Sequence, residues 1–292
     1  MRWTGDVSAG DWIAARLGRP GTVGGTVPIG FEAYARIFHP VEGTRLTASA
    51  ASPERFDSRP FSWAELASEK GTVWHGGMQW DAVVGKQFDG VDLADGWTVR
   101  SPILGHLDLD QLAVLAGLLA TNTMTAARCV VGVWNGWGDL RPGSGSVSVL
   151  AFAGEVDPAQ RREAEESFRR MRREAVSPEV SIALQWGPLL ELPQREYVLL
   201  AADVRELTDP SWTEAAGVGW AGQFSGPTLN LLWPADHAWF LASEIDFDST
   251  LVGGSRTLID AIVADPVLEA AEVGPETDLT WRGDALNPMP PG

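Results

Sequence analysis

Cysteine, lysine and long apolar runs are scarce in this chain of 292 residues. The single cysteine, Cys129, excludes an internal disulfide, and its position in the apolar run CVVGVW predicts a small buried side chain. No apolar run approaches the roughly 20 residues that span a bilayer, so the sequence predicts no transmembrane helix. The N-terminus has no apolar segment followed by a cleavage site, and we therefore expect a protein of the reducing cytoplasm.

Positive charge is scarce as well. The chain has 22 Lys and Arg against 39 Asp and Glu, which gives a net charge of −17, and only Lys70 and Lys86 are lysines. Such a charge repels phosphate backbones and anionic membranes, so we expect neither nucleic acid nor a membrane as a partner. It permits a small cationic ligand, a divalent cation or a basic protein partner, and it also serves solubility alone.

Tryptophan is abundant, with 14 residues against two tyrosines. Indole side chains serve as core residues, as interface anchors or as platforms on which a ligand stacks. Because the tryptophans are scattered from Trp3 to Trp281 and form no cluster, the sequence favours the core role for most of them.

Capping signals and apolar spacing predict several helices. The clearest covers residues 109–120, where Asp108 is the N-cap, Gln111 follows at the third helical position and the leucines form one stripe. A second, densely charged helix begins at Asp157-Pro158 and reads as a solvated surface helix. Further helices are expected over 9–18 after Ser8, 63–70 between Ser62 and Gly71, and 256–264 after Ser255.

Short β-rich runs predict the strands. They cover residues 31–40, 129–134, 147–153, 180–186, 196–203, 228–233 and 238–246. Residues 41–61 read as a loop with an edge strand near 45–49. Since strands and helices do not alternate strictly, the sequence predicts an α+β fold, with mostly antiparallel sheets and a few packing helices.

The domain organisation is open at this level. A single domain and two lobes with a seam near 155–177 are both compatible with the pattern. The proline-rich tail 273–292 is expected to be extended or disordered.

Several stretches resemble a family of uncharacterised actinobacterial proteins. They are GFEAYARIFHP (30–40), GHLDLDQL (105–112), VWNGWG (133–138), LELPQREYVLL (190–200) and LLWPADHAWFLASEIDFDSTLVGGS (231–255). The resemblance implies no activity. In composition alone, the chain is also similar to immunity proteins of bacterial polymorphic-toxin systems, many of which are acidic, tryptophan-containing α+β modules of the cytoplasm.

The segment EIDFD contains the strongest chemical signal. If it lies on a strand, Glu244, Asp246 and Asp248 project to one face and could bind a hard divalent cation such as Mg²⁺ or Ca²⁺. Neighbouring carboxylates also shift one another's pKa values, which suits acid–base catalysis. The EF-hand pattern is absent, and a solvated strand face that leads into a Gly-Gly-Ser turn is the simpler interpretation.

Histidines and tryptophans supply the other candidates. His39 before Pro40 and His75 beside Trp74 could join Asp246 as catalytic groups through tertiary contact, although the chain has no H-E-x-x-H motif. In VWNGWG, three residues at the end of a probable central strand could line a pocket for a sugar or aromatic ligand, or could simply close the core. These residues are Trp134, Asn135 and Trp137.

Three functional hypotheses follow. The first is a non-enzymatic module that binds a basic protein partner or a small ligand through an acidic surface and a Trp-lined cleft. The second is a metal-assisted hydrolase or related enzyme that uses Glu244, Asp246 and Asp248 with His39 or His75. The third is a structural scaffold without a pocket. No recognisable catalytic motif is present, which favours the first hypothesis.

Overall fold

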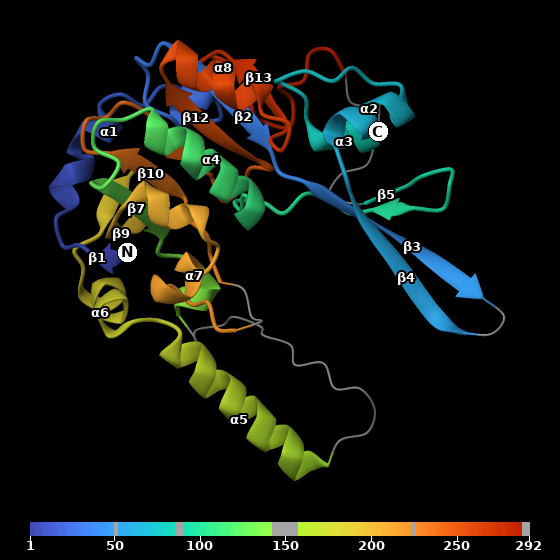
Figure 1. The fold of residues 1–292 in the computed structure, drawn as a ribbon, viewed down its shortest axis with the longest axis horizontal. Coiled ribbons are helices and arrows are strands. Elements are labelled where there is room, and N and C mark those ends of the chain that lie inside the picture. The colour runs from blue at the N-terminus through green and yellow to red at the C-terminus, as the bar shows by residue number, and fades with distance from the viewer. Residues whose placement is uncertain (50–51, 86–89, 142–156, 223–225, 288–292) are drawn as a thin grey trace.

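The computed structural model describes residues 1–49, 52–85, 90–141, 157–222 and 226–287, and the side chains of residues 48–55 are not described. The fold is α+β with antiparallel sheets, as the sequence predicts (Figure 1). The strand predicted over 147–153 lies outside the described residues. None of the described helices is both long and apolar enough to cross a bilayer.

A large antiparallel sheet forms the body of the molecule. In spatial order it contains β1 (Arg2–Trp3), β9 (Arg195–Ala202), β7 (Cys129–Trp134), β10 (Leu231–Pro234), β11 (Phe240–Ala242), β12 (Ser249–Gly254), β2 (Ala33–Phe38) and β13 (Ala270–Val273), with β8 (Leu190–Leu192) beside β9. Both faces are buried in separate apolar clusters. In β7, Val131 and Val133 pack on one face and Val130 on the other, which explains the continuous apolar run.

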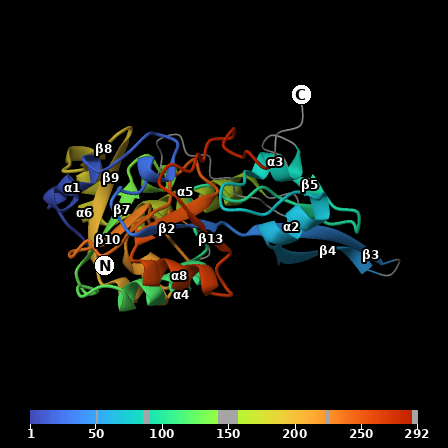
Figure 2. The same ribbon diagram turned by 90° about the horizontal axis from the view of Figure 1, so that it is seen from above.

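Helices cover one face of this sheet. Figure 2 shows α4 (Leu109–Thr121) and α8 (Arg256–Ala264) side by side, and both contribute leucines to the same apolar cluster. Their predicted caps are confirmed: Asp108 accepts hydrogen bonds from the N–H groups of Asp110 and Gln111, and Ser255 accepts one from Leu258. The 3-10 helix η4 (Val204–Thr208) and α7 (Trp212–Ala215) extend the layer.

The opposite face is covered by the N-terminal and C-terminal segments. They include the 3-10 helices η1 (Val7–Gly10) and η2 (Val23–Gly25) and the single turn α1 (Asp11–Ala14). The helix predicted over 9–18 is therefore wrong in its extent, because Ile13 alone is fully buried and the chain turns after Ala14.

A second, smaller sheet contains the edge strand expected near 45–49, whereas the prediction of a loop over the rest of 41–61 is wrong. The sheet contains β4 (Ser52–Phe61), β3 (Val41–Ser49), β6 (Thr98–Val99) and β5 (Val91–Asp92) in spatial order. Strands β3 and β4 form a hairpin that projects from the body (Figure 1). Only the base of the hairpin contributes to the core, through Val41 and Phe61, so its outer part lacks the apolar alternation that would have indicated strands.

Two short helices complete this smaller unit. They are α2 (Trp63–Lys70), capped by Ser62 and ended by Gly71 at φ 68° as predicted, and α3 (Trp80–Val84). The carboxylate of Glu269, which precedes β13, accepts hydrogen bonds of 2.7 Å from the N–H groups of both Trp63 and Ala64. This contact joins the start of α2 to the large sheet.

The strand predicted over 180–186 is wrong. Residues 178–186 form α6 (Pro178–Trp186), because Ser177 accepts a hydrogen bond from the N–H of Val180 and Pro178 occupies the first helical turn. These two start signals outweigh the β-rich composition of VSIALQW. The charged helix is confirmed as α5 (Pro158–Glu174), and Figure 1 shows it projecting from the body.

The expected seam near 155–177 coincides with α5, and the division into domains stays a prediction.

The expected extended or disordered tail is described only to residue 287, beyond β13. Residues 274–287 have no helix or strand, yet Asp284 and Asn287 are buried. Asp284 binds His75 and the N–H of Gln79, while Asn287 hydrogen-bonds the backbone of Val73. The tail therefore packs on the smaller unit.

A buried arginine links the large sheet to the smaller unit. Arg36, on β2, is 1% exposed and donates from Nε to Ser249 and from Nη2 to Asp248, both at 2.8 Å. Its Nη1 donates to the carbonyl oxygens of Gly76 at 3.1 Å and Met78 at 2.6 Å. The guanidinium thus binds groups from two separate segments, residues 248–249 and 76–78, which satisfies the donors that its burial would otherwise leave unpaired.

Replacement of Arg36 by methionine should destabilise the fold by about 3–5 kcal/mol, because it leaves a partly buried carboxylate and two carbonyl groups without their donor. Urea unfolding followed by circular dichroism measures this. Adding Asp248→Leu should recover part of the loss, since no unpaired charge then remains. Arg256→Ala, which removes the exposed pair with Glu272, is the control and should shift the midpoint little. An equal shift in Arg36→Met and Arg256→Ala would contradict this role.

Candidate functional site

The EIDFD segment lies in a turn and not on a strand, so the predicted one-sided row of carboxylates is wrong. Strand β11 ends at Ala242 and β12 begins at Ser249, and residues 243–248 connect them. The strands predicted over 228–233 and 238–246 are present as β10 and β11, which pair with each other but are shorter than predicted. The predicted Gly-Gly-Ser turn is wrong, because Gly253 and Gly254 end β12 and pair with β2.

The three carboxylates of this turn bind two different arginines. Arg195 donates from Nε and Nη2 to Glu244 at 3.0 and 2.6 Å, and from Nη2 to Asp246 at 2.8 Å. Asp248 binds Arg36 instead. Among the described residues, no group of three or more His, Cys, Asp or Glu side chains is placed to hold a metal ion. The arrangement therefore does not direct the three carboxylates at one cation.

The turn instead forms one wall of a cleft of about 440 Å³, which we call the acidic cleft. Its charged lining consists of Asp81, Asp246 and Asp248, and its aromatic lining includes Trp80, Phe247 and Trp281. These residues come from α3, from the β11–β12 turn and from the C-terminal segment. Side chains that are far apart in sequence thus meet where the two sheets adjoin.

The described lining of the acidic cleft is negatively charged, although arginines outside it bind some of the carboxylates. Arg195 carries one positive charge and binds both Glu244 and Asp246, so one negative charge stays uncompensated within this group. The side chain of Asp246 is 72% exposed at the rim. The described residues that line the cleft include no lysine or arginine. Its field therefore favours a positively charged group.

Trp281 offers an aromatic surface beside these acids. It is 49% exposed, and the guanidinium carbon of Arg282 lies 4.2 Å from its ring centroid. This is the geometry in which an aromatic face attracts a cation. A carboxylate rim and an exposed indole together form a surface suited to a guanidinium or ammonium group.

His39 is a buried structural residue. Its Nδ1 lies 2.7 Å from the carbonyl oxygen of Ile103 and its Nε2 lies 3.0 Å from Oγ1 of Thr250. Burial lowers the pKa of His39 from 6.5 to about 4. The imidazole is therefore neutral at pH 7, and both of its nitrogens already have partners.

His75 holds the C-terminal segment in place. Its Nε2 lies 2.9 Å from Oδ1 of Asp284, and its Nδ1 accepts a hydrogen bond of 3.2 Å from the N–H of Gly77. Both nitrogens are therefore occupied. The described contacts do not bring His39, His75 and Asp246 into one hydrogen-bonded group, as the catalytic hypothesis requires.

The VWNGWG residues close an edge of the core and do not line the acidic cleft. The indole N–H of Trp137 and the backbone N–H of Trp134 both donate to Oδ1 of Asn230 at 2.9 Å. The two indoles pack edge to face at 5.6 Å, and Asn135 donates to Glu196 at 2.6 Å. Cys129 is buried too, and desolvation raises the pKa of its thiol to about 12, which makes it a poor nucleophile.

Sequence reasoning missed Arg36, Arg195, Asp81 and the role of Trp281. A signal existed for Arg36, because an arginine within the apolar strand AYARIF requires a buried partner. The other three belong to segments whose approach depends on the tertiary fold, and no local pattern identifies them.

Comparisons with models of protein families, with curated proteins and with solved structures find no match. The resemblance to uncharacterised actinobacterial proteins therefore stays an expectation. The functional argument depends on the geometry of this chain alone.

Acidification should expose the role of His39. Its folded pKa of about 4 lies below its unfolded value of 6.5, so the unfolded chain binds more protons between these values and stability falls as the pH falls. From pH 7 to pH 5 this group alone should cost about 2 kcal/mol. Urea unfolding at pH 7 and pH 5 should show that the free energy of unfolding falls less for His39→Gln than for the unaltered protein. Equal losses in the two proteins would contradict the assignment.

Proposed function

We propose that this protein is a non-enzymatic binding module of the bacterial cytoplasm, whose acidic cleft holds a positively charged side chain of a basic protein partner. The observation that carries the proposal is the meeting of Asp81, Asp246 and Asp248 with Trp80 and Trp281 around a cleft of about 440 Å³. This volume lies within the range of small-molecule sites and accommodates a long side chain such as that of arginine.

The physical argument is complementarity. A guanidinium group can donate to the exposed carboxylate of Asp246 while its plane packs on the indole of Trp281. The net charge of −17 attracts a basic partner over a longer range and accelerates its encounter with the cleft. The described lining also contains the apolar side chains of Pro102, Leu104 and Leu279, which suit the methylene groups of a long basic side chain.

The two other hypotheses have weaker support. A metal-assisted hydrolase would need the carboxylates of the EIDFD turn and a histidine around one centre. Instead, the carboxylates bind arginines, His75 binds Asp284, and His39 binds Thr250. A scaffold without a pocket does not account for the acidic cleft. We therefore retain recognition as the function.

The test uses a fluorescently labelled hexa-arginine peptide and fluorescence anisotropy. Asp246→Asn should weaken binding roughly tenfold, because it removes a charge-assisted hydrogen bond. Trp281→Ala should weaken it roughly fivefold through loss of the cation–π contact. A hexa-glutamate peptide should not bind. Added salt should reduce the affinity of the unaltered protein more than that of Asp246→Asn.

Asp260→Asn is the matched control, since it removes one equally exposed negative charge on α8 and far from the cleft lining. It should leave the affinity within about twofold. If Asp260→Asn and Asp246→Asn weaken binding equally, the peptide recognises overall charge and the cleft is not the site. Titration with Mg²⁺, Mn²⁺, Ca²⁺ and Zn²⁺ tests the enzyme alternative. Metal binding that is abolished by Asp246→Asn would support that alternative.

A further inference from the structure

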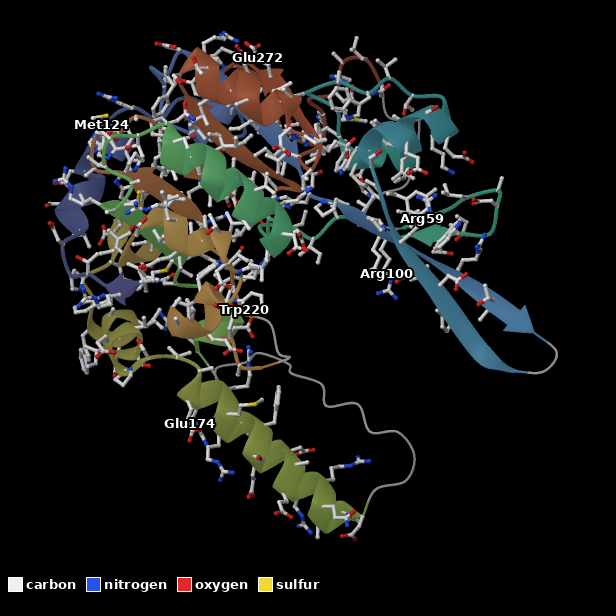
Figure 3. The ribbon with its side chains drawn as sticks, viewed as in Figure 1. Arg59, Arg100, Met124, Glu174, Trp220 and Glu272 are labelled. Carbon is white, nitrogen blue, oxygen red and sulfur yellow. The ribbon has the colours of Figure 1, made fainter. Side chains whose placement is uncertain are left out.

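A second cavity, of about 450 Å³, lies beside the first turn of α4. We call it the histidine cavity, because His39 and His106 both line it. Its remaining described walls come from Pro40, from the segment that precedes α4, and from Pro210, Trp220, Gly226 and Thr228. Trp220, labelled in Figure 3, belongs to the latter wall and follows α7 in the chain.

The walls of the histidine cavity are largely apolar and include a fixed indole. Leu107, Leu109 and Pro210 line it together with Trp220. The indole N–H of Trp220 donates to the carbonyl oxygen of Pro227 at 2.8 Å, which satisfies its polar atom and holds the ring in one orientation. The cavity thus presents a preorganised aromatic ring beside aliphatic side chains, the surface on which a flat apolar group packs best.

His106 supplies the polar group inside the cavity. Its Nδ1 lies 3.4 Å from Oγ1 of Thr228, and its ring packs at 4.7 Å against Trp137. Its Nε2 has no hydrogen-bond partner among the described residues. Burial lowers the pKa of His106 below 6.5, so the ring is neutral at pH 7. His39 lines the same cavity but both of its nitrogens are occupied.

Negative charge marks the edge of this cavity. Asp108 and Asp110, both exposed, line it at the start of α4. Asp108 accepts two backbone hydrogen bonds as the N-cap, whereas no contact within the described residues engages the carboxylate of Asp110. Neither lysine nor arginine is present in the part of the lining that the structure describes. An anionic ligand would therefore meet carboxylates without a compensating cation.

We propose that the histidine cavity is a binding site for a small arylalkylamine, in which an alkyl chain joins an aromatic ring to an ammonium group. The aromatic ring packs on Trp220 and the leucines, the ammonium group lies at the carboxylate of Asp110, and His106 Nε2 offers a hydrogen bond to a polar substituent. The site is separate from the acidic cleft and does not depend on the function proposed for it. Residues 101–110 divide the two, since Pro102 and Leu104 line the acidic cleft while Ile103 and His106 line the histidine cavity.

Three probes of one shape and different charge test the proposal: 2-phenylethylamine, 2-phenylethanol and phenylacetate. Binding to the full chain is followed by the indole N–H signals in ¹H–¹⁵N NMR spectra. The amine should bind at least roughly tenfold more tightly than phenylacetate, with the alcohol between them. The signals of Trp220 and Trp137 should shift, and they should do so at lower amine concentrations than any shift of Trp281 in the acidic cleft.

Two variants separate charge from shape. Asp110→Asn should remove most of the preference for the amine and leave the affinity for 2-phenylethanol unchanged. Trp220→Leu should weaken the binding of all three probes. An otherwise unchanged NMR spectrum would show that this variant is folded. Asp260→Asn, which removes an exposed carboxylate on α8 that is not part of the described cavity lining, is the control and should change nothing. Equal affinities for amine and acid, shifts confined to Trp281, or no saturable binding by any probe would overturn the proposal.

Discussion

The burial of one guanidinium group is the constraint on which the arrangement of this protein depends. Arg36 lies on β2 at the end of the large sheet, where its apolar neighbours leave no water to solvate a charge. It is stable there only because Asp248, Ser249 and the carbonyl oxygens of Gly76 and Met78 surround it. These partners belong to the β11–β12 turn and to the segment before α3, and both of these segments form walls of the acidic cleft. The cleft is thus a consequence of how the arginine is satisfied.

Arginine also determines the chemistry of the carboxylates. In the sequence, Glu244, Asp246 and Asp248 suggest a cation site. In the structure, Glu244 and Asp246 form ion pairs with Arg195, and Asp248 forms one with Arg36. Of the three carboxylates, only Asp246 stays largely exposed, so this single residue, rather than the row, is accessible to a ligand. A backbone hydrogen bond holds the segment between the two cavities, because the N–H of Gly105 donates to the carbonyl oxygen of Phe247 at 2.8 Å. Gly105 has a φ of 70°, and a Cβ atom added to it would lie 2.7 Å from Cα of Ile245, so this position excludes any residue with a side chain.

Much of the large sheet could be predicted, because its signals are local. The run CVVGVW, the N-cap at Asp108 and the Ser255 cap each depend on a few neighbouring residues, and each appears where expected. The sequence does not predict the β3–β4 hairpin, because the described side chains that pack on the core, Val41 and Phe61, lie only at its base. It predicts a strand in place of α6, because the β-rich composition of this segment conceals the helix start at Ser177-Pro178. The candidate site was predicted only in part. Asp246 and Asp248 do line a cleft, but Asp81 and Trp281 reach it from positions far along the chain, and no local pattern encodes that approach.

The central claim is that a cation binds where α3, the β11–β12 turn and the C-terminal segment meet. Hydrogen–deuterium exchange of the full chain with and without the hexa-arginine peptide tests it most directly, because exchange reports the location of contact without any substitution. The account predicts that protection gained on binding is concentrated in residues 79–81, 101–104, 246–248 and 279–281, which line the acidic cleft. Protection spread over other acidic surfaces, with no change in these four segments, would contradict it.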